Sequence, residues 1–307
     1  MKKGIIITAV ILLAAGALIF AGGKLPPVTY EAKSYAVNEP FTGICLDTHE
    51  MNIELIPSAD GTCSVAAAET EKTYVNVSVQ DGVLTVTTVD ERTWIDRLFM
   101  SADQPLQIFL PGKEYKALTV ESHTGDVKVP DSFSFESIRI NASTGDVTCG
   151  ASASGPVEIT ATTGDVTVEN CRADTLLLSV STGRVNAASV TCAGDLSVTV
   201  STGRSTLKDV ACKSLLSKGG TGDVTMENVI AEETISIERS TGDVRFERCD
   251  AQELLIETDT GDVTGTLLSA KIFFTKSDTG RIEVPETTTG GKCRITTDTG
   301  DIRISIP

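Results

Sequence analysis

Aromatic and basic residues are scarce in this 307-residue sequence. Phe, Trp and Tyr together make up 5% of it, and Trp94 is the single tryptophan. Carbohydrate-active β-helix enzymes need aromatic platforms in an exposed groove, so this composition disfavours them. Lys and Arg number 26 against 42 Asp and Glu, which gives a formal net charge of −16. Long-range repulsion then opposes nucleic acid and bare anionic bilayers as partners.

Histidine is scarcer still, because His49 and His123 are the only two. No group of Cys and His has the spacing of a zinc site, and no Ser, His and Asp set forms a defensible catalytic arrangement. The glycine-rich stretch SKGGTGD at Ser217 lacks the Lys-Ser/Thr of a phosphate-binding loop. The sequence therefore predicts no enzyme, no cofactor and no metal ion.

The N-terminal segment contains the longest stretch without a charge. Residues 4–23 read GIIITAVILLAAGALIFAGG, and a helix needs about 20 apolar residues to cross a bilayer. We expect residues 1–25 to be a single-pass membrane anchor with Lys2 and Lys3 on the cytoplasmic side, and a cleaved signal peptide is the alternative. In both cases the rest of the chain lies outside the cytoplasm. Residues 26–43 contain three prolines and are expected to be a linker.

A Thr-Gly motif recurs every 19 or 20 residues from residue 123 onward. Such a period indicates stacked structural units, none of which can bury its apolar face alone. Apolar residues alternate on both sides of the motif, as at Val157, Ile159 and Val166, which indicates strands with one buried face. The motif glycines are Gly125, Gly145, Gly164, Gly183, Gly203, Gly222, Gly242, Gly261, Gly280 and Gly300.

These features predict an all-β fold. Residues 123–307 would form a right-handed parallel β-solenoid, or β-helix, of about ten regular coils, since right-handed winding is the default for parallel crossovers. Each coil would pair with the next one in the sequence at ~4.8 Å. The motif glycine would make a corner with a positive φ, and the Asp after it would bond local backbone amides.

Three corners read Asp-Thr-Gly, the catalytic triplet of aspartic proteases, at Asp259, Asp278 and Asp298. Those enzymes need two such loops facing one another, so that two carboxylates share a proton. Corners in neighbouring coils lie along one edge instead, which argues against proteolysis. The aspartates that follow the motif glycines could attract Ca²⁺, but partial neutralisation by Arg184 and Arg204 is the favoured interpretation.

Eight cysteines in an exported chain raise the question of disulfides. Cys192 and Cys212 both lie nine residues after their motif glycine, so they should stack in adjacent coils at a distance compatible with a disulfide. Burial as small apolar residues is the favoured interpretation for the cysteines. Cys149 fits it, because Val168 and Met226 occupy its position in other coils.

The two ends of the solenoid are expected to differ from its regular coils. Residues 44–122 predict an irregular β region with a hairpin at Asp81-Gly82. Within it, residues 91–104 include RTWIDRLFM, an apolar stretch expected to cap the solenoid, although it could also dip into a membrane or grip a partner. The chain finishes on DIRISIP, and an unpaired edge at Ile302–Ile306 would favour self-association or a partner.

Three segments resemble a known family: IELIPS at Ile53, DGVLTV at Asp81 and LQIFLPG at Leu106, followed by TGDV corners. They resemble the bacterial putative-adhesin β-strand repeat family of unknown function, a group that includes LiaG-like envelope proteins. The resemblance spans about residue 44 to the C-terminus. It implies a β-solenoid exposed outside the membrane, often behind an N-terminal anchor, with no established enzyme activity. The chain departs from the repeat at Arg184, Arg204, Ser205 and Arg281.

The sequence thus predicts a non-enzymatic, membrane-anchored β-solenoid outside the cytoplasm, with a structural, adhesin-like or envelope-stress role. A carbohydrate-active β-helix enzyme and a self-assembling scaffold are the alternatives. The expected partners are the membrane and either a second copy of the chain or another envelope protein.

Overall fold

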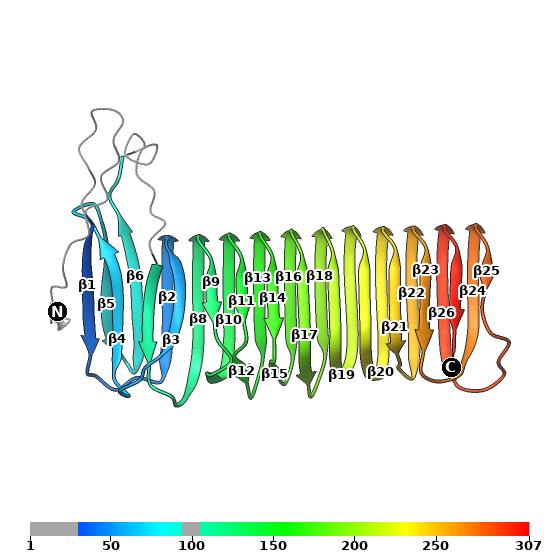
Figure 1. Cartoon of the computed structure of the whole chain (residues 1–307), viewed down its shortest axis with the longest axis horizontal. Coiled ribbons are helices and arrows are strands. Elements are labelled where there is room, and N and C mark those ends of the chain that lie inside the picture. Colours follow the sequence, from blue (N-terminus) through cyan, green and yellow to red (C-terminus); the bar gives the residue numbers. More distant parts are fainter. Residues whose placement is uncertain (1–29, 94–104, 307) are drawn as a thin grey trace.

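The fold is a rod of stacked β-coils (Figure 1). The computed structural model describes residues 30–93 and 105–306, and within them it contains strands, turns and bends but no helix. The strands of successive coils pair in parallel, so the predicted all-β solenoid is confirmed. The predicted anchor at residues 1–25 lies outside the described residues. Among the residues that are described, we find no helix long and apolar enough to span a bilayer.

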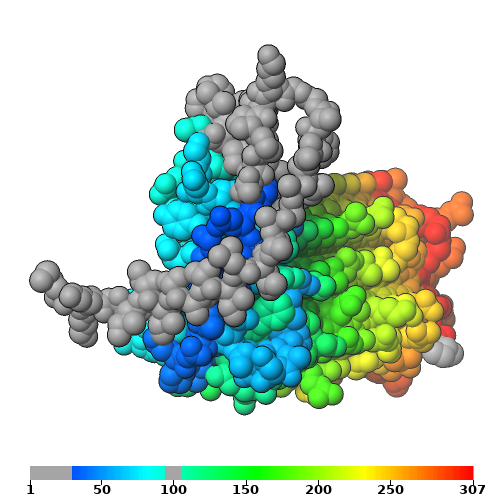
Figure 2. All heavy atoms as spheres, turned by 60° about the vertical axis from the view of Figure 1, so that its left-hand side comes forward, coloured from blue at the N-terminus to red at the C-terminus, as the bar shows by residue number. Residues whose placement is uncertain are grey.

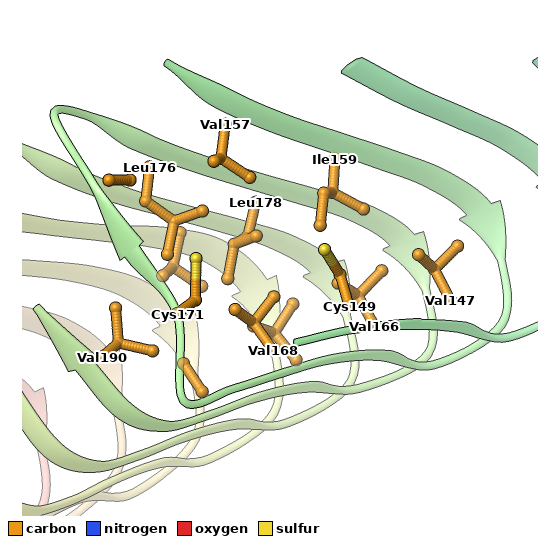
Figure 3. Packing of buried hydrophobic residues seen from close by; sticks show 14 of the residues in the cluster. Val147, Cys149, Val157, Ile159, Val166, Val168, Cys171, Leu176, Leu178 and Val190 are labelled. Atoms are coloured by element: carbon orange, nitrogen blue, oxygen red, sulfur yellow. The ribbon is translucent and has the colours of Figure 1, made fainter. Parts of the chain in front are cut away.

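One coil illustrates how the sequence builds the rod. β13 (Val157–Thr163) runs along one face, Gly164 turns the chain, and β14 (Val166–Glu169) runs along the second face. Asn170 makes a second corner with a φ of +57°, just before the short strand β15 (Arg172–Ala173). Alternate side chains of both faces point into the core (Figure 3), as the period of two predicts.

Neighbouring coils stack in register. Ile140 pairs with Ile159, and Ile159 pairs with Leu178, so the inward side chains form continuous columns. The other strands are β1 (Glu31–Val37), β2 (Gly43–Glu50), β3 (Asn52–Pro57), β4 (Cys63–Glu69), β5 (Thr73–Gln80), β6 (Val83–Asp90), β7 (Pro105–Leu110), β8 (Glu114–Thr124), β9 (Val127–Val129), β10 (Ser134–Thr144), β11 (Val147–Cys149), β12 (Ser152–Ala153), β16 (Leu176–Thr182), β17 (Val185–Cys192), β18 (Leu196–Thr202), β19 (Ser205–Thr221), β20 (Val224–Thr241), β21 (Val244–Cys249), β22 (Glu253–Thr260), β23 (Val263–Leu267), β24 (Lys271–Thr279), β25 (Ile282–Glu283), β26 (Gly291–Thr299) and β27 (Ile302–Ser305).

The order of the coils in the rod departs from their order in the sequence at the C-terminal end. β26 lies between β22 and β24, and β27 lies between β23 and β25. The expected pairing of each coil with the next is therefore wrong here. So is the unpaired edge predicted at Ile302–Ile306, because β27 is paired on both sides and Ile302 is fully buried. The open end is formed by β24 and β25 instead.

Apolar burial explains this exchange. The inward positions of β26 and β27 include Cys293, Ile295 and Ile302, all fully buried between two coils. The corresponding inward positions of β24 include Thr275 and Ser277, which are paired in register with Ile295 and Thr297. A coil with polar inward side chains sacrifices less apolar burial when it lies at the open end of the rod, where its side chains stay closer to water.

The N-terminal end contains a similar exchange and a cap. The coil of β2 and β3 lies between β6–β7 and β8–β9. Antiparallel strands β1, β4 and β5 cover the end, and Asp81 and Gly82 form the predicted β5–β6 hairpin with positive φ. The cap predicted at residues 91–104 falls largely on 94–104, outside the described residues.

Strand β1 replaces most of the linker that the sequence predicts at residues 26–43. Its sequence EAKSYAV contains no buried residue, and it pairs with β4 along all seven residues. Lys33 Nζ lies 2.9 Å from Glu69 Oε2, and Tyr35 donates a 2.5 Å hydrogen bond to the same carboxylate. β1 is held by polar contacts with the buried Glu69. An alternation of buried apolar residues in the sequence therefore does not predict this strand.

Candidate functional site

The motif glycines form one column along an edge of the rod. Nine of them have φ between +128° and +156°, a region that residues with a Cβ rarely adopt. A Cβ on Gly203 would also lie 1.7 Å from the carbonyl oxygen of Gly183, and a Cβ on each of the other motif glycines would lie 1.9 to 2.5 Å from a carbonyl oxygen of the neighbouring coil. Glycine is thus required both for the turn and for the spacing of the coils.

The aspartate after the glycine connects neighbouring coils. The backbone N–H of Asp165 donates to Asp146 Oδ1 at 2.8 Å, and the N–H of Asp146 donates to Asp126 Oδ1 at 2.8 Å. The carboxylate accepts a hydrogen bond from a backbone amide, as expected, but this amide belongs to the next coil and is not local. A ladder of such bonds runs along the corner. Asn52 Oδ1 begins it, and it resumes beyond the arginine corners with Asp223, Asp243, Asp262 and Asp301.

Two corner arginines pair with flanking aspartates. Arg184 Nε lies 3.3 Å from Asp165 Oδ2, and Arg204 Nε lies 3.6 Å from Asp223 Oδ2. This bears out the expected neutralisation, although pairs this exposed add little stability. Within residues 30–93 and 105–306, no group of three or more His, Cys, Asp and Glu side chains could hold a metal ion.

The three Asp-Thr-Gly triplets lie along one edge in adjacent coils. β22, β26 and β24 carry them in that spatial order, so Asp298 lies between Asp259 and Asp278. All three aspartates are exposed, and Asp278 forms a 2.8 Å ion pair with Lys276. Such a row on one outer face does not provide the opposed pair of loops that shares a proton in aspartic proteases.

The cysteines are free thiols in the described chain, and all except the half-buried Cys45 are buried. β17 and β19 pair up to Thr191 and Ala211, which places Cys192 and Cys212 side by side at the next position. Burial raises the pKa of Cys192 to about 11 and that of Cys212 to about 12. These thiols behave as small apolar core residues.

We expect the folded protein to resist thiol labelling. At pH 8, a pKa of about 12 leaves on the order of 10⁻⁴ of a thiol as the reactive thiolate. Titration with a disulfide reagent should therefore label no more than Cys45 in the native state and eight thiols in urea. Cys45→Ser should remove the native signal. Rapid native labelling of several thiols, or an intact mass that changes on reduction, would contradict the prediction.

A buried arginine interrupts the core. Arg239 is 3% exposed and occupies an inward position of β20. Its Nη2 donates to Ser205 Oγ at 3.0 Å and to Ser217 Oγ at 3.1 Å, and its Nη1 donates to the Val200 carbonyl at 3.2 Å. Gly219 leaves room for the guanidinium, since a Cβ there would lie 1.6 Å from Nη1.

Arg239 explains why Ser205 stands at an inward position where the repeat has an apolar residue, because the Ser205 hydroxyl accepts a hydrogen bond from the buried guanidinium. Desolvation lowers the pKa of Arg239 to about 10, because the cation has lost water without gaining a carboxylate partner. Its Nε has no hydrogen-bond partner among the described residues. The repeat pattern does not predict this cluster, although the alternation Ile235, Ile237, Arg239 places a charge at an inward position.

We expect Arg239→Met to stabilise the protein by about 1 kcal/mol, because replacing a buried charge by an apolar side chain of similar length is often favourable. Urea unfolding at neutral pH measures the change. Arg245→Met on the exposed face, where Arg245 is 53% exposed, serves as the control and should change stability by less than about 0.5 kcal/mol. A clear loss of stability in Arg239→Met would show that its hydrogen bonds outweigh its desolvation.

An open groove of about 590 Å³ lies where the chain crosses from β23 to β24. Lys271 is 3% exposed at its base. Its Nζ lies 2.5 Å from Asp250 Oδ1, 2.7 Å from the Ala251 carbonyl and 2.8 Å from Ser269 Oγ. All three ammonium donors are thus used. Lys271 therefore stabilises the connection between β23 and β24 and is not available as a nucleophile.

The strongest candidate for an interaction surface is the open end formed by β24 and β25. β24 pairs only with β26, and β25 pairs only with β27, among the described strands. Phe274 and Ile282 are 49% and 42% exposed there, and Phe273 and Val284 are partly buried beside them. Backbone groups along a free strand edge can pair with another strand.

Comparisons with known proteins agree with this fold. A Parabacteroides distasonis structure described as a putative adhesin matches with a TM-score of 0.54 at 14% identity, over 90% of this chain and 97% of that one. Putative adhesins from Parabacteroides merdae and Bacteroides fragilis match with TM-scores of 0.47 and 0.41, at 16% and 15% identity. They cover 78% and 89% of this chain, and 96% of their own chains in each case. No curated protein matches the sequence.

The family comparison covers nearly the whole described chain. The model of the Toastrack DUF4097 family matches residues 41–203 and again residues 191–307. These ranges contain the two N-terminal coils, every motif glycine and the exchanged coils at the open end. The resemblance noted in the sequence is therefore confirmed, and the chain belongs to the Toastrack DUF4097 family.

Proposed function

We propose that this protein is a non-enzymatic, right-handed β-solenoid that stands outside the cytoplasm on an N-terminal membrane anchor and acts through its surface. Residues 4–23 are apolar enough to cross a bilayer. The solved structures described as putative adhesins support a surface role, because they share the fold. The observation that carries the proposal is the difference between the two ends of the rod.

The end nearest the N-terminus is covered, and the far end is open. β1, which follows the apolar segment in the sequence, belongs to the antiparallel cap (Figure 1). Twelve parallel coils separate that cap from the opposite face of β24 and β25 in the described chain, and at ~4.8 Å per coil they span on the order of 60 Å. An anchor before β1 would therefore present the open end away from the membrane.

A second copy of this chain is the occupant that we propose for the open end. The protein carries a net charge of −16, yet residues 271–290 contain three basic and three acidic side chains. Two copies therefore meet little net repulsion at this coil. Because the cap blocks the other end, such contacts would close into a tail-to-tail dimer rather than extend into a filament.

Location can be tested with a reporter enzyme on the full chain. Alkaline phosphatase fused after Pro307 folds only outside the cytoplasm, so we expect active enzyme in the membrane fraction that remains bound through a carbonate wash. Deletion of residues 4–23 should abolish phosphatase activity. An inactive fusion would overturn the proposed location, and an active but freely soluble one would indicate a cleaved signal peptide.

Association can be tested separately by sedimentation of the full chain in detergent. We expect a dimer that becomes a monomer when Phe274→Lys and Ile282→Lys are combined, because two added charges per copy then face each other across the contact. Leu177→Lys is the matched control, since Leu177 is 43% exposed in the middle of the rod. A monomeric wild type, or an equal effect of the control, would overturn the proposed contact.

A further inference from the structure

The only two histidines of the chain lie against each other on the outer surface of the rod. His49 is on β2 and His123 is on β8, and these strands pair in parallel from residue 43 onward. Their ring centroids are 4.8 Å apart with an interplanar angle of 35°. Both side chains are exposed. A separation of 74 residues in the sequence hides this pair from any search for motif spacing.

Histidine is unusual at this point of the coil. His123 immediately precedes the Thr-Gly of its corner, where the other regular coils have Ser, Thr, Gly or Asp. His49 occupies the equivalent place one coil away, as the register of β2 with β8 shows. Because nothing in the corner's geometry calls for imidazole, the pairing points to a chemical role for the rings.

A hydrogen bond fixes the tautomer of one ring. Nδ1 of His123 lies 3.2 Å from the carbonyl oxygen of Thr48. A carbonyl can only accept, so Nδ1 carries the proton and the lone pair of Nε2 remains available. Histidines that bind metals use this same second bond to a backbone carbonyl or carboxylate. The main chain of His49 is held by a 2.8 Å bond from its N–H to Thr88 Oγ1.

Charge near the pair also favours a cation. Asp47 and Glu121 are partners in the register of β2 and β8, two residues before each histidine and therefore on the same face. Among the described side chains, no third His, Cys, Asp or Glu completes a compact set of ligands. The protein would thus supply two ligands, and water would supply the others, as at open metal sites.

We propose that His49 and His123 together bind one divalent first-row transition metal ion, of the kind that prefers imidazole, such as Ni²⁺ or Zn²⁺. The Nε2 of His123 is one ligand and a ring nitrogen of His49 is the other. The ion would join the coil of β2 and β3 to that of β8 and β9, and so add a crosslink between residues distant in the sequence. The site is independent of the proposed anchoring and dimerisation.

Calorimetric titration of the full chain, purified in detergent without a histidine tag, tests the site. We expect one equivalent of Ni²⁺ or Zn²⁺ to bind, and His49→Gln or His123→Gln each to weaken binding by about tenfold or more, since each removes one of two protein ligands. Glu121→Gln is the matched control and should weaken binding less. Ca²⁺, which prefers oxygen ligands, should not distinguish the variants from wild type.

Chemical modification and thermal unfolding test the site independently of calorimetry. Diethyl pyrocarbonate modifies free imidazole nitrogens, and we expect saturating Zn²⁺ to protect both histidines of the wild type from it. Zn²⁺ should also raise the melting temperature of the wild type but not of the doubly substituted protein. Equal metal affinity in wild type and both histidine variants, or full modification in the presence of Zn²⁺, would overturn the proposal.

Discussion

Gly203→Ala is expected to destabilise the rod by about 3 kcal/mol or more, because it combines backbone strain with a clash against another backbone. Gly203 has a φ of +141°, and a Cβ there would lie 1.7 Å from the carbonyl oxygen of Gly183. The carbonyl cannot move aside without disturbing the pairing of β16 with β18. Urea and thermal unfolding followed by circular dichroism measure the loss.

Two other glycines separate the strain from the clash. Gly61 also has a positive φ of +74°, but a Cβ there would meet nothing within 4 Å, so Gly61→Ala should cost only about 1 kcal/mol. Gly112 has open space and no positive φ, and Gly112→Ala should change stability by less than about 0.5 kcal/mol. If Gly203→Ala cost no more than Gly61→Ala, close stacking of the corners would not explain the motif.

The sequence reveals the regular part of this fold because several requirements coincide at each repeat. The corner needs glycine for its φ and for its contact with the next coil, and the following aspartate accepts an amide hydrogen bond. Alternation such as Val157, Ile159 and Ala161 then identifies the inward face. Any one of these signals is weak, but their shared period makes coil, corner and core predictable.

Several coils also have a second corner, which the repeat pattern of the sequence does not predict. Asn170, Ser189, Asp209, Asn228 and Arg248 all have φ between +52° and +57°. Asn and Asp adopt this conformation more readily than most residues, whereas Ser or Arg in a sequence does not indicate a positive φ. Because the residue type varies from coil to coil, this turn has no motif comparable with Thr-Gly.

The candidate sites were hidden for a different reason. The histidine pair and the Lys271 crossover each depend on which strands become neighbours over long separations. The Arg239 cluster was detectable in principle, because a charged residue at an inward position demands polar partners in the adjoining coils. Ser205 and Ser217 are such residues, and both stand at inward positions of β19.

The exchanged coils at the open end are the least predictable feature, since the motif spacing is the same on both sides of them. Gly261, Gly280 and Gly300 follow one another at intervals of 19 and 20 residues. Only the inward side chains differ between the two coils. A comparison of Phe273, Thr275 and Ser277 with the fully buried Cys293, Ile295 and Thr297 would have suggested which coil stands outside.

Truncation after Gly290 should therefore destabilise the protein much more than the loss of a terminal coil. β24 and β25 pair only with β26 and β27 in the described chain, so removing residues 291–307 leaves both strands without a pairing partner. The coil of β22 and β23 also loses β26 and β27 as neighbours, so its inward side chains become exposed at the end of the rod. We expect a loss of about 5 kcal/mol, as several apolar side chains worth ~1.5 to 3 kcal/mol each become exposed.

A longer truncation, after Leu267, provides the control. It removes both exchanged coils. Its melting temperature should be close to that of the protein truncated after Gly290, because β24 and β25 have no strand to pair with once β26 and β27 are gone, and the contacts of Lys271 with Asp250 and Ala251 are the difference that remains. Trypsin should cut the shorter truncation quickly after Lys276 and Arg281 while leaving these sites slow in the full chain. If residues 271–290 stayed resistant, and the shorter truncation were clearly the more stable of the two, the coils would stack in sequence order and the exchange would be wrong.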